Sequence, residues 1–112
     1  MPLLRMSRSQ LVESLNVLAG MAKRNRRLKA TFTFANSVLA IKVGSTAIEI
    51  YATGDWNGVA TCSGQAFLIA SRDLPEADPI TIAIADGRLF IERRSVSCDW
   101  RENRPPRATT IH

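Results

Sequence analysis

The segment TFTFANSVLAIK at residues 31–42 is the most informative part of the chain, because a closely similar pattern, TIAIADGRLFIE, returns at residues 81–92. The two segments align without a gap, and their identical pairs are Thr31/Thr81, Ala35/Ala85, Leu39/Leu89 and Ile41/Ile91. Each has alternating apolar residues on both sides of a turn-forming pair, which is typical of a two-residue β-hairpin. We therefore expect two hairpins built to one plan. Chance similarity remains open, since such alternation is common to half-buried strands.

The residues around each hairpin extend the repeat. A short strand over 2–6 leads to Ser7, which can cap a helix that runs to about Ala22. Three strands follow, and the second half repeats the plan with a strand at 59–62, a short helix at 65–72 and three more strands. The predicted fold class is α+β, with two βαβββ units related by a pseudo-twofold axis and with both helices on one side of the sheets.

Length and composition indicate one globular domain. With 112 residues, of which 46% are hydrophobic and 22% charged, the chain can bury a core without metal or disulfide support. We expect this domain to cover residues 1–101, with unit one at about 3–53 and unit two at about 58–101. Residues 102–112, which include two prolines and no periodicity, are predicted to form a flexible basic tail. No apolar stretch is long enough to cross a membrane, so we expect no membrane partner and a cytoplasmic location.

The doubled strand-helix-three-strand pattern resembles one domain of the DNA sliding clamp, in particular the bacterial DNA polymerase III beta subunit. The most specific stretch is LPEADPITIAIADGRLFI at residues 74–91, and SQLVESL at residues 9–15 is similar to the family's first helix. The resemblance covers about residues 3–101. It implies a DNA-clamp-like fold in which six such domains close a ring around DNA, so that this chain would need six copies.

The resemblance implies a non-enzymatic protein that self-associates through its sheet edges and binds DNA, independently of base sequence, or DNA replication or repair proteins. An alternative is a small protein-interaction module with the clamp fold but without DNA encirclement. A basic nucleic-acid-binding protein unrelated to clamps is a third interpretation. The net charge of +5 at pH 7 is compatible with an anionic partner.

The densest charge cluster is KRNRRLK at residues 23–29. Arginine offers a bidentate fork to phosphate oxygens, so this cluster is a candidate DNA contact, and the second predicted helix adds one further arginine. The candidate DNA-binding residues are Lys23, Arg24, Arg26, Arg27, Lys29 and Arg72. The alternative is a solvated loop whose cations complement the end of the preceding helix.

Trp56 lies in the turn-rich connection GDWNG at residues 54–58 and is a candidate partner-binding aromatic. The alternative is that its ring folds back over the sheet, since single aromatics in connections are common.

The remaining chemistry-bearing residues predict no catalytic site. Cys62 and Cys98 have no Cys-x-x-Cys spacing, and the single histidine, His112, is the last residue, so we expect buried thiols and no metal. A disulfide could form only if the fold brought the two cysteines together, and the expected cytoplasmic location argues against it. We find no phosphate-binding glycine loop and no nucleophile motif, and we therefore expect neither enzyme activity nor a cofactor.

Overall fold

The computed structural model describes residues 2–22 and 27–103 of the chain. Within these residues the order strand, helix, three strands occurs twice. The first half contains β1 (Leu3–Met6), α1 (Arg8–Ala22), β2 (Lys29–Ala35), β3 (Val38–Val43) and β4 (Thr46–Asp55). The second half contains β5 (Gly58–Ser63), α2 (Gly64–Ala70), β6 (Ile80–Ala85), β7 (Arg88–Ile91) and β8 (Arg94–Glu102).

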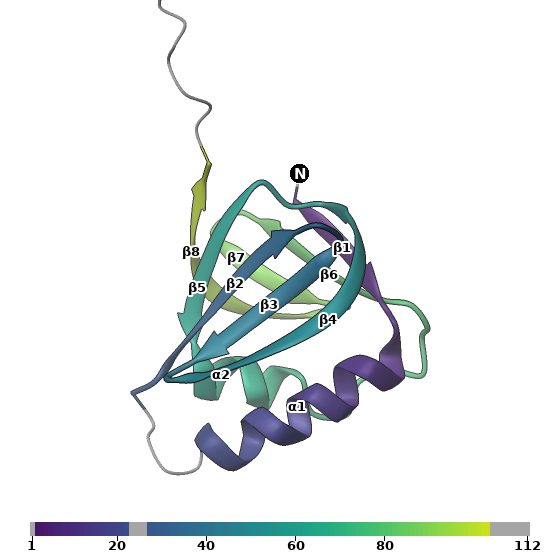
Figure 1. Ribbon diagram of the computed structural model, residues 1–112, viewed down its shortest axis with the longest axis vertical. Coiled ribbons are helices and arrows are strands. Elements are labelled where there is room, and N and C mark those ends of the chain that lie inside the picture. The colour runs from purple at the N-terminus through teal and green to yellow at the C-terminus, as the bar shows by residue number, and fades with distance from the viewer. Residues whose placement is uncertain (1, 23–26, 104–112) are drawn as a thin grey trace, which may run out of the picture.

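The eight strands close into one antiparallel barrel in the order β1-β4-β3-β2-β5-β8-β7-β6, with β6 returning to β1 (Figure 1). Two long-range pairings join the halves, one between β1 and β6 and the other between β2 and β5. Strands β4 and β8 are long, and each pairs with a different neighbour at either end. Every strand therefore has a hydrogen-bonded neighbour on both sides.

The predicted α+β class with a clamp-like arrangement is wrong, because the strands form a closed barrel and the helices do not cover one side of open sheets. Both helices lie together at one end of the barrel, where α1 contacts β3 and β4 and α2 contacts β2, β5 and β8 (Figure 1). Closure also removes the open edges through which self-association was expected, because a barrel has no edge strand to offer.

The two hairpins predicted from the repeated segments are confirmed. Strand β2 pairs with β3 around Asn36-Ser37, and β6 pairs with β7 around Asp86-Gly87. All four turn residues have positive φ angles, between 52° and 72°, as the tight turn of a two-residue hairpin requires. The register repeats as well: Phe32 is opposite Ile41 in the first hairpin, and Ile82 is opposite Ile91 in the second.

Each helix starts at a serine that follows a strand. The Ser63 hydroxyl accepts a hydrogen bond from the Ala66 backbone N–H at 3.2 Å, and the Ser7 hydroxyl accepts one from Gln10 at 3.4 Å. A side-chain oxygen at this position satisfies one of the free N–H groups of the first helical turn. The helix starts are thus fixed locally by the sequence.

The core fills the barrel and the space between the barrel and the helices. Alternate strand residues point inward, as in β4, where Ile48, Ile50 and Ala52 are buried between exposed neighbours. Phe32 of β2 contacts Phe67 of α2 edge to face, with ring centroids 4.8 Å apart, and neither side chain is exposed. This aromatic pair connects the barrel interior to the helical end.

Candidate functional site

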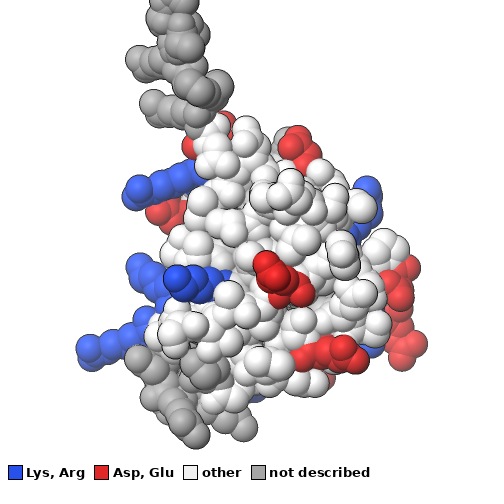
Figure 2. All heavy atoms as spheres, viewed as in Figure 1, with Lys and Arg blue, Asp and Glu red and all other residues white. Residues whose placement is uncertain are grey.

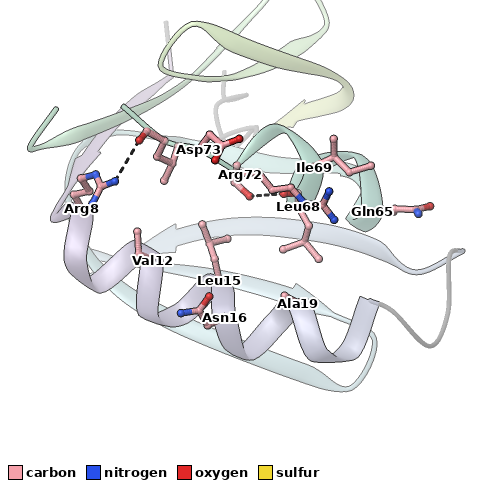
Figure 3. Close-up of a pocket in the computed structure, with 12 residues that line it drawn as sticks. Arg8, Val12, Leu15, Asn16, Ala19, Gln65, Leu68, Ile69, Arg72 and Asp73 are labelled. Atoms are coloured by element: carbon pink, nitrogen blue, oxygen red, sulfur yellow. Dashed lines mark hydrogen bonds between the residues drawn. The ribbon is translucent and has the colours of Figure 1, made fainter. Parts of the chain in front are cut away.

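A groove of about 360 Å³ separates the two helices at the end of the barrel (Figure 3). Helix α1 contributes Arg8, Val12, Leu15, Asn16 and Ala19, which recur at helical spacing along one face. Helix α2 and the turn after it contribute Gln65, Leu68, Ile69, Ser71, Arg72, Asp73 and Leu74. The facing sides of two adjacent helices therefore form the walls of one continuous concave surface.

Apolar side chains form the floor and walls of the groove. Leu15 and Leu74 are buried, whereas Val12 and Leu68 are half-buried and project into the gap between the helices, Val12 from α1 and Leu68 from α2 (Figure 3). Ile69 also lines the groove and is 50% exposed. The groove thus presents apolar surface that the described part of the chain leaves uncovered.

The rim of the groove is polar and contains two arginines. The Arg8 guanidinium donates hydrogen bonds to the backbone oxygens of Pro75, at 2.9 Å, and Leu74, at 3.2 Å, and so holds the segment that follows α2 against α1. Arg72 is exposed, and its own carbonyl accepts a hydrogen bond from Arg94 at 3.0 Å. The groove lining therefore includes the charged side chains of Arg8, Arg72 and Asp73, and the Arg94 guanidinium lies against the Arg72 backbone.

The candidate DNA-binding residues are divided between separate places. Lys23, Arg24 and Arg26 lie outside the described residues. Arg27 and Lys29 are exposed and line a second hollow, whereas Arg72 lines the groove between the helices. Figure 2 shows Lys and Arg gathered along the β5 and β8 side of one face, with Asp and Glu at the centre of this face and along its opposite side. The described residues of the candidate set do not share one pocket.

Trp56 lies in the core and not on the surface. Its side chain is 3% exposed, its indole N–H donates to the Phe32 carbonyl at 3.4 Å, and its ring meets Trp100 edge to face at 5.2 Å. A buried indole with its N–H satisfied has no surface to offer a partner. The alternative in which Trp56 folds back over the sheet is therefore the one found.

The two cysteines lie opposite each other on neighbouring strands, with Cys62 in β5 and Cys98 in β8, and both are free thiols. Burial, and to a lesser extent the charge of Cys98, raises the pKa of Cys62 to about 12. Burial also raises the pKa of Cys98, with Asp99 acting in the same direction and Arg88 in the opposite one. Both residues are thus protonated thiols at neutral pH.

No group of three or more His, Cys, Asp or Glu side chains suited to a metal ion occurs within residues 2–22 and 27–103. Neither of the helices seen in those ranges has the length and apolar character needed to span a membrane.

Comparison of the chain with protein-family models, with curated proteins and with solved structures finds no match. The resemblance to a sliding-clamp domain therefore gains no support from relatives.

The groove had a partial signal in the sequence. The apolar face of the first helix contains Leu11, Leu15 and Leu18, which are fully or almost fully buried, but also Val12 and Ala19, which are only half-buried. The apolar face of this helix is wider than its contact with the barrel requires. This extra width indicates a second neighbouring surface. Nothing in the sequence indicated that this second neighbour is α2.

Proposed function

We propose that this protein is a non-catalytic interaction domain that binds an acidic, apolar segment of a partner protein in the groove between α1 and α2. The observation that supports this proposal is the concave apolar surface formed by Val12, Leu68 and Ile69, open to solvent at the helical end of the barrel. Uncovered apolar surface with a polar rim is typical of protein-interaction sites.

Charge complementarity identifies the chemistry of the partner. In the described part of the chain, Arg8 and Arg72 form no ion pair, and the acceptors of Arg8 are uncharged carbonyl oxygens. Arg94 adds a third positive charge beside the Arg72 carbonyl. A partner carboxylate beside Arg8 or Arg72 would gain charge-assisted hydrogen bonds, and bidentate ones if it meets a guanidinium edge. The apolar side chains of the bound partner segment would then lie along Val12 and Leu68.

Selection from a phage-displayed library of random dodecapeptides tests the proposal. We expect enrichment of peptides that combine two or more large apolar residues with Asp or Glu. Synthetic copies should bind Leu68→Asp at least about tenfold more weakly, because that change buries a charge in the groove wall. Arg72→Ala should weaken binding by about three- to tenfold, and added salt should reduce this difference.

The matched control is Thr53→Asp, which places the same charge on an exposed position of β4 outside the groove lining. This variant should bind the selected peptides as the unchanged protein does. Selected peptides that bind Leu68→Asp with unchanged affinity would contradict the groove as the docking site.

Duplex DNA is the second candidate partner, supported by the exposed Arg27 and Lys29 and by the net charge of +5. Because phosphate contacts release counterions, binding of a fluorescent duplex should weaken steeply with salt and be lost when Lys23, Arg24, Arg26 and Arg27 are changed to alanine. Fluorescence anisotropy at two salt concentrations checks this expectation. DNA binding unaffected by the four changes would exclude the basic cluster as the contact, while Leu68→Asp serves as the control outside that cluster.

A further inference from the structure

The register of β5 and β8 places Cys62 directly opposite Cys98. Both residues belong to the inward-facing set of their strands: Ala60 and Cys62 are buried on β5, and Val96 is buried on β8 with Cys98 half-buried two residues later. The two thiols therefore project from the same face of the sheet, and no residue stands between them in the pairing.

The backbone hydrogen bonds define the spacing of this pair. The Cys98 N–H donates to the Gly87 carbonyl at 3.0 Å, on the β7 side, and so points away from β5. Cys62 and Cys98 thus form a non-hydrogen-bonded antiparallel pair, the type in which the Cα atoms are about 4.5 Å apart and the side chains approach most closely. Disulfides span Cα separations of roughly 4.4–6.8 Å, so this pair can be bridged without a backbone rearrangement.

We propose that Cys62 and Cys98 are a reversible dithiol site that a low-molecular-weight disulfide such as oxidised glutathione converts to a cross-strand disulfide between β5 and β8. The inference rests on the geometry of these strands and is independent of the groove between the helices. The pairing of β5 with β8 brings the two cysteines together, which is the condition that a disulfide between them has to meet.

The reaction proceeds by two thiol–disulfide exchanges. Cys98, the more accessible thiol, loses its proton and attacks glutathione disulfide, which forms a mixed disulfide and releases one glutathione thiolate. Cys62 then loses its proton and attacks the Cys98 sulfur, which forms the internal disulfide and releases the second glutathione. The two protein thiols are oxidised, one glutathione disulfide is reduced to two thiols, and the two protons end on the released glutathiones.

The surroundings favour a slow reaction with a stable product. Burial raises the pKa of both thiols, so the thiolate fraction at neutral pH is small and the rate should increase about tenfold per pH unit between 7 and 8. The charged groups near the pair are Asp99 and Arg88 beside Cys98, and Arg27 and Lys29 in the hollow that Cys62 lines. These cations would attract the carboxylates of glutathione disulfide.

The other half of the molecule contains an internal counterpart of this pair. Met6 of β1 stands opposite Ala52 of β4 in the same register relation, one residue before the serine that caps α1. Ala52 likewise donates its N–H to a turn residue, Ser37, at 3.0 Å. The two positions share one backbone geometry, and in the second half both are cysteine.

The test is equilibration of the full chain with glutathione buffers of defined ratio, followed by acid quenching, intact-mass measurement and peptide mapping. We expect a monomer that has lost two hydrogen atoms and yields a linked Cys62–Cys98 peptide. The equilibrium constant against glutathione should be about 30-fold or more higher in the folded protein than in the urea-unfolded chain, because the fold holds the thiols together.

Three results would overturn the proposal: a persistent glutathione adduct on Cys98 without the internal bond, a disulfide-linked dimer, or an equilibrium constant no higher than that of the unfolded chain. Cys62→Ala is the control, and it should stop at the Cys98 adduct. The doubly substituted Met6→Cys/Ala52→Cys protein in a Cys62→Ala/Cys98→Ala background provides a second test, since the same geometry should produce the same internal disulfide.

Discussion

Phe32→Ala is expected to lower the free energy of unfolding by about 3–5 kcal/mol, because it removes a fully buried ring and leaves a cavity where the barrel meets α2. Domains of this kind have a total stability of about 5–15 kcal/mol, so the variant should be close to unfolding. Urea denaturation followed by tryptophan fluorescence measures the loss. With a urea dependence of about 1–3 kcal/mol per molar, the midpoint should fall by roughly 2 M.

Thr33→Ala is the matched control, because Thr33 is the next residue of β2 and its side chain is exposed. This change should cost less than about 1 kcal/mol. Equal losses in both variants would show that Phe32 is not a core residue. The double variant Phe32→Ala/Phe67→Ala should lose about 0.5–1.5 kcal/mol less than the sum of the single changes, because the edge-to-face contact at 4.8 Å can be lost only once.

Gly54→Ala is expected to destabilise the protein by about 3 kcal/mol or more, through the closure of the barrel. Gly54 has a φ angle of 140°, and a Cβ atom at this position would clash with the Leu3 carbonyl oxygen. Gly54 is also the residue of β4 that pairs with Leu4 of β1. Since the obstacle is backbone, the added methyl group can be accommodated only if β1 moves away from β4.

Gly87→Ala is the control that separates the steric clash of an added Cβ atom from the cost of a positive φ angle. Gly87 also has a positive φ angle, of 72°, but nothing lies within 4 Å of an added Cβ atom. This control should therefore cost only the backbone penalty of about 1–2 kcal/mol. Hydrogen exchange provides the local measurement: Gly54→Ala should increase exchange of the β1 and β4 amides more than that of the β7 amides. Equal loss of stability in the two variants would contradict a steric role for Gly54.

The local elements of this protein could be predicted because their signals lie within a few residues. The turn pairs Asn36-Ser37 and Asp86-Gly87 supply the positive φ angles of two hairpins, and Ser7 precedes the first helix. The alternation of Ile48, Ile50 and Ala52 with more polar residues agrees with their burial on one face of β4. Such alternation distinguishes one face of a strand from the other, but it does not predict which strands pair with each other.

The candidate site could be predicted only in part. The helical spacing of Val12 and Ala19 in the sequence puts them on one apolar face, but their position beside Leu68 depends on how α2 packs against α1. Both cysteines were expected to be buried thiols, but only Cys62 is buried and Cys98 is half-buried, and their direct opposition follows from the pairing of β5 with β8. Trp56 lies in a connection rich in turn formers, and only the packed structure shows that Phe32 and Trp100 enclose it.

The sequence by itself determined the hairpins, the helix starts and the inward face of each strand, because these depend on backbone preferences and side-chain alternation between close neighbours. Only the tertiary structure decided that Leu3 lies beside both Asp55 and Ala83, which closes the barrel and removes the sheet edges. Pairings between such distant segments have no local signal, since their register is set by strand twist and by the packing of a shared core. The same closure placed both helices at one end, formed the groove between them and brought Cys62 to Cys98.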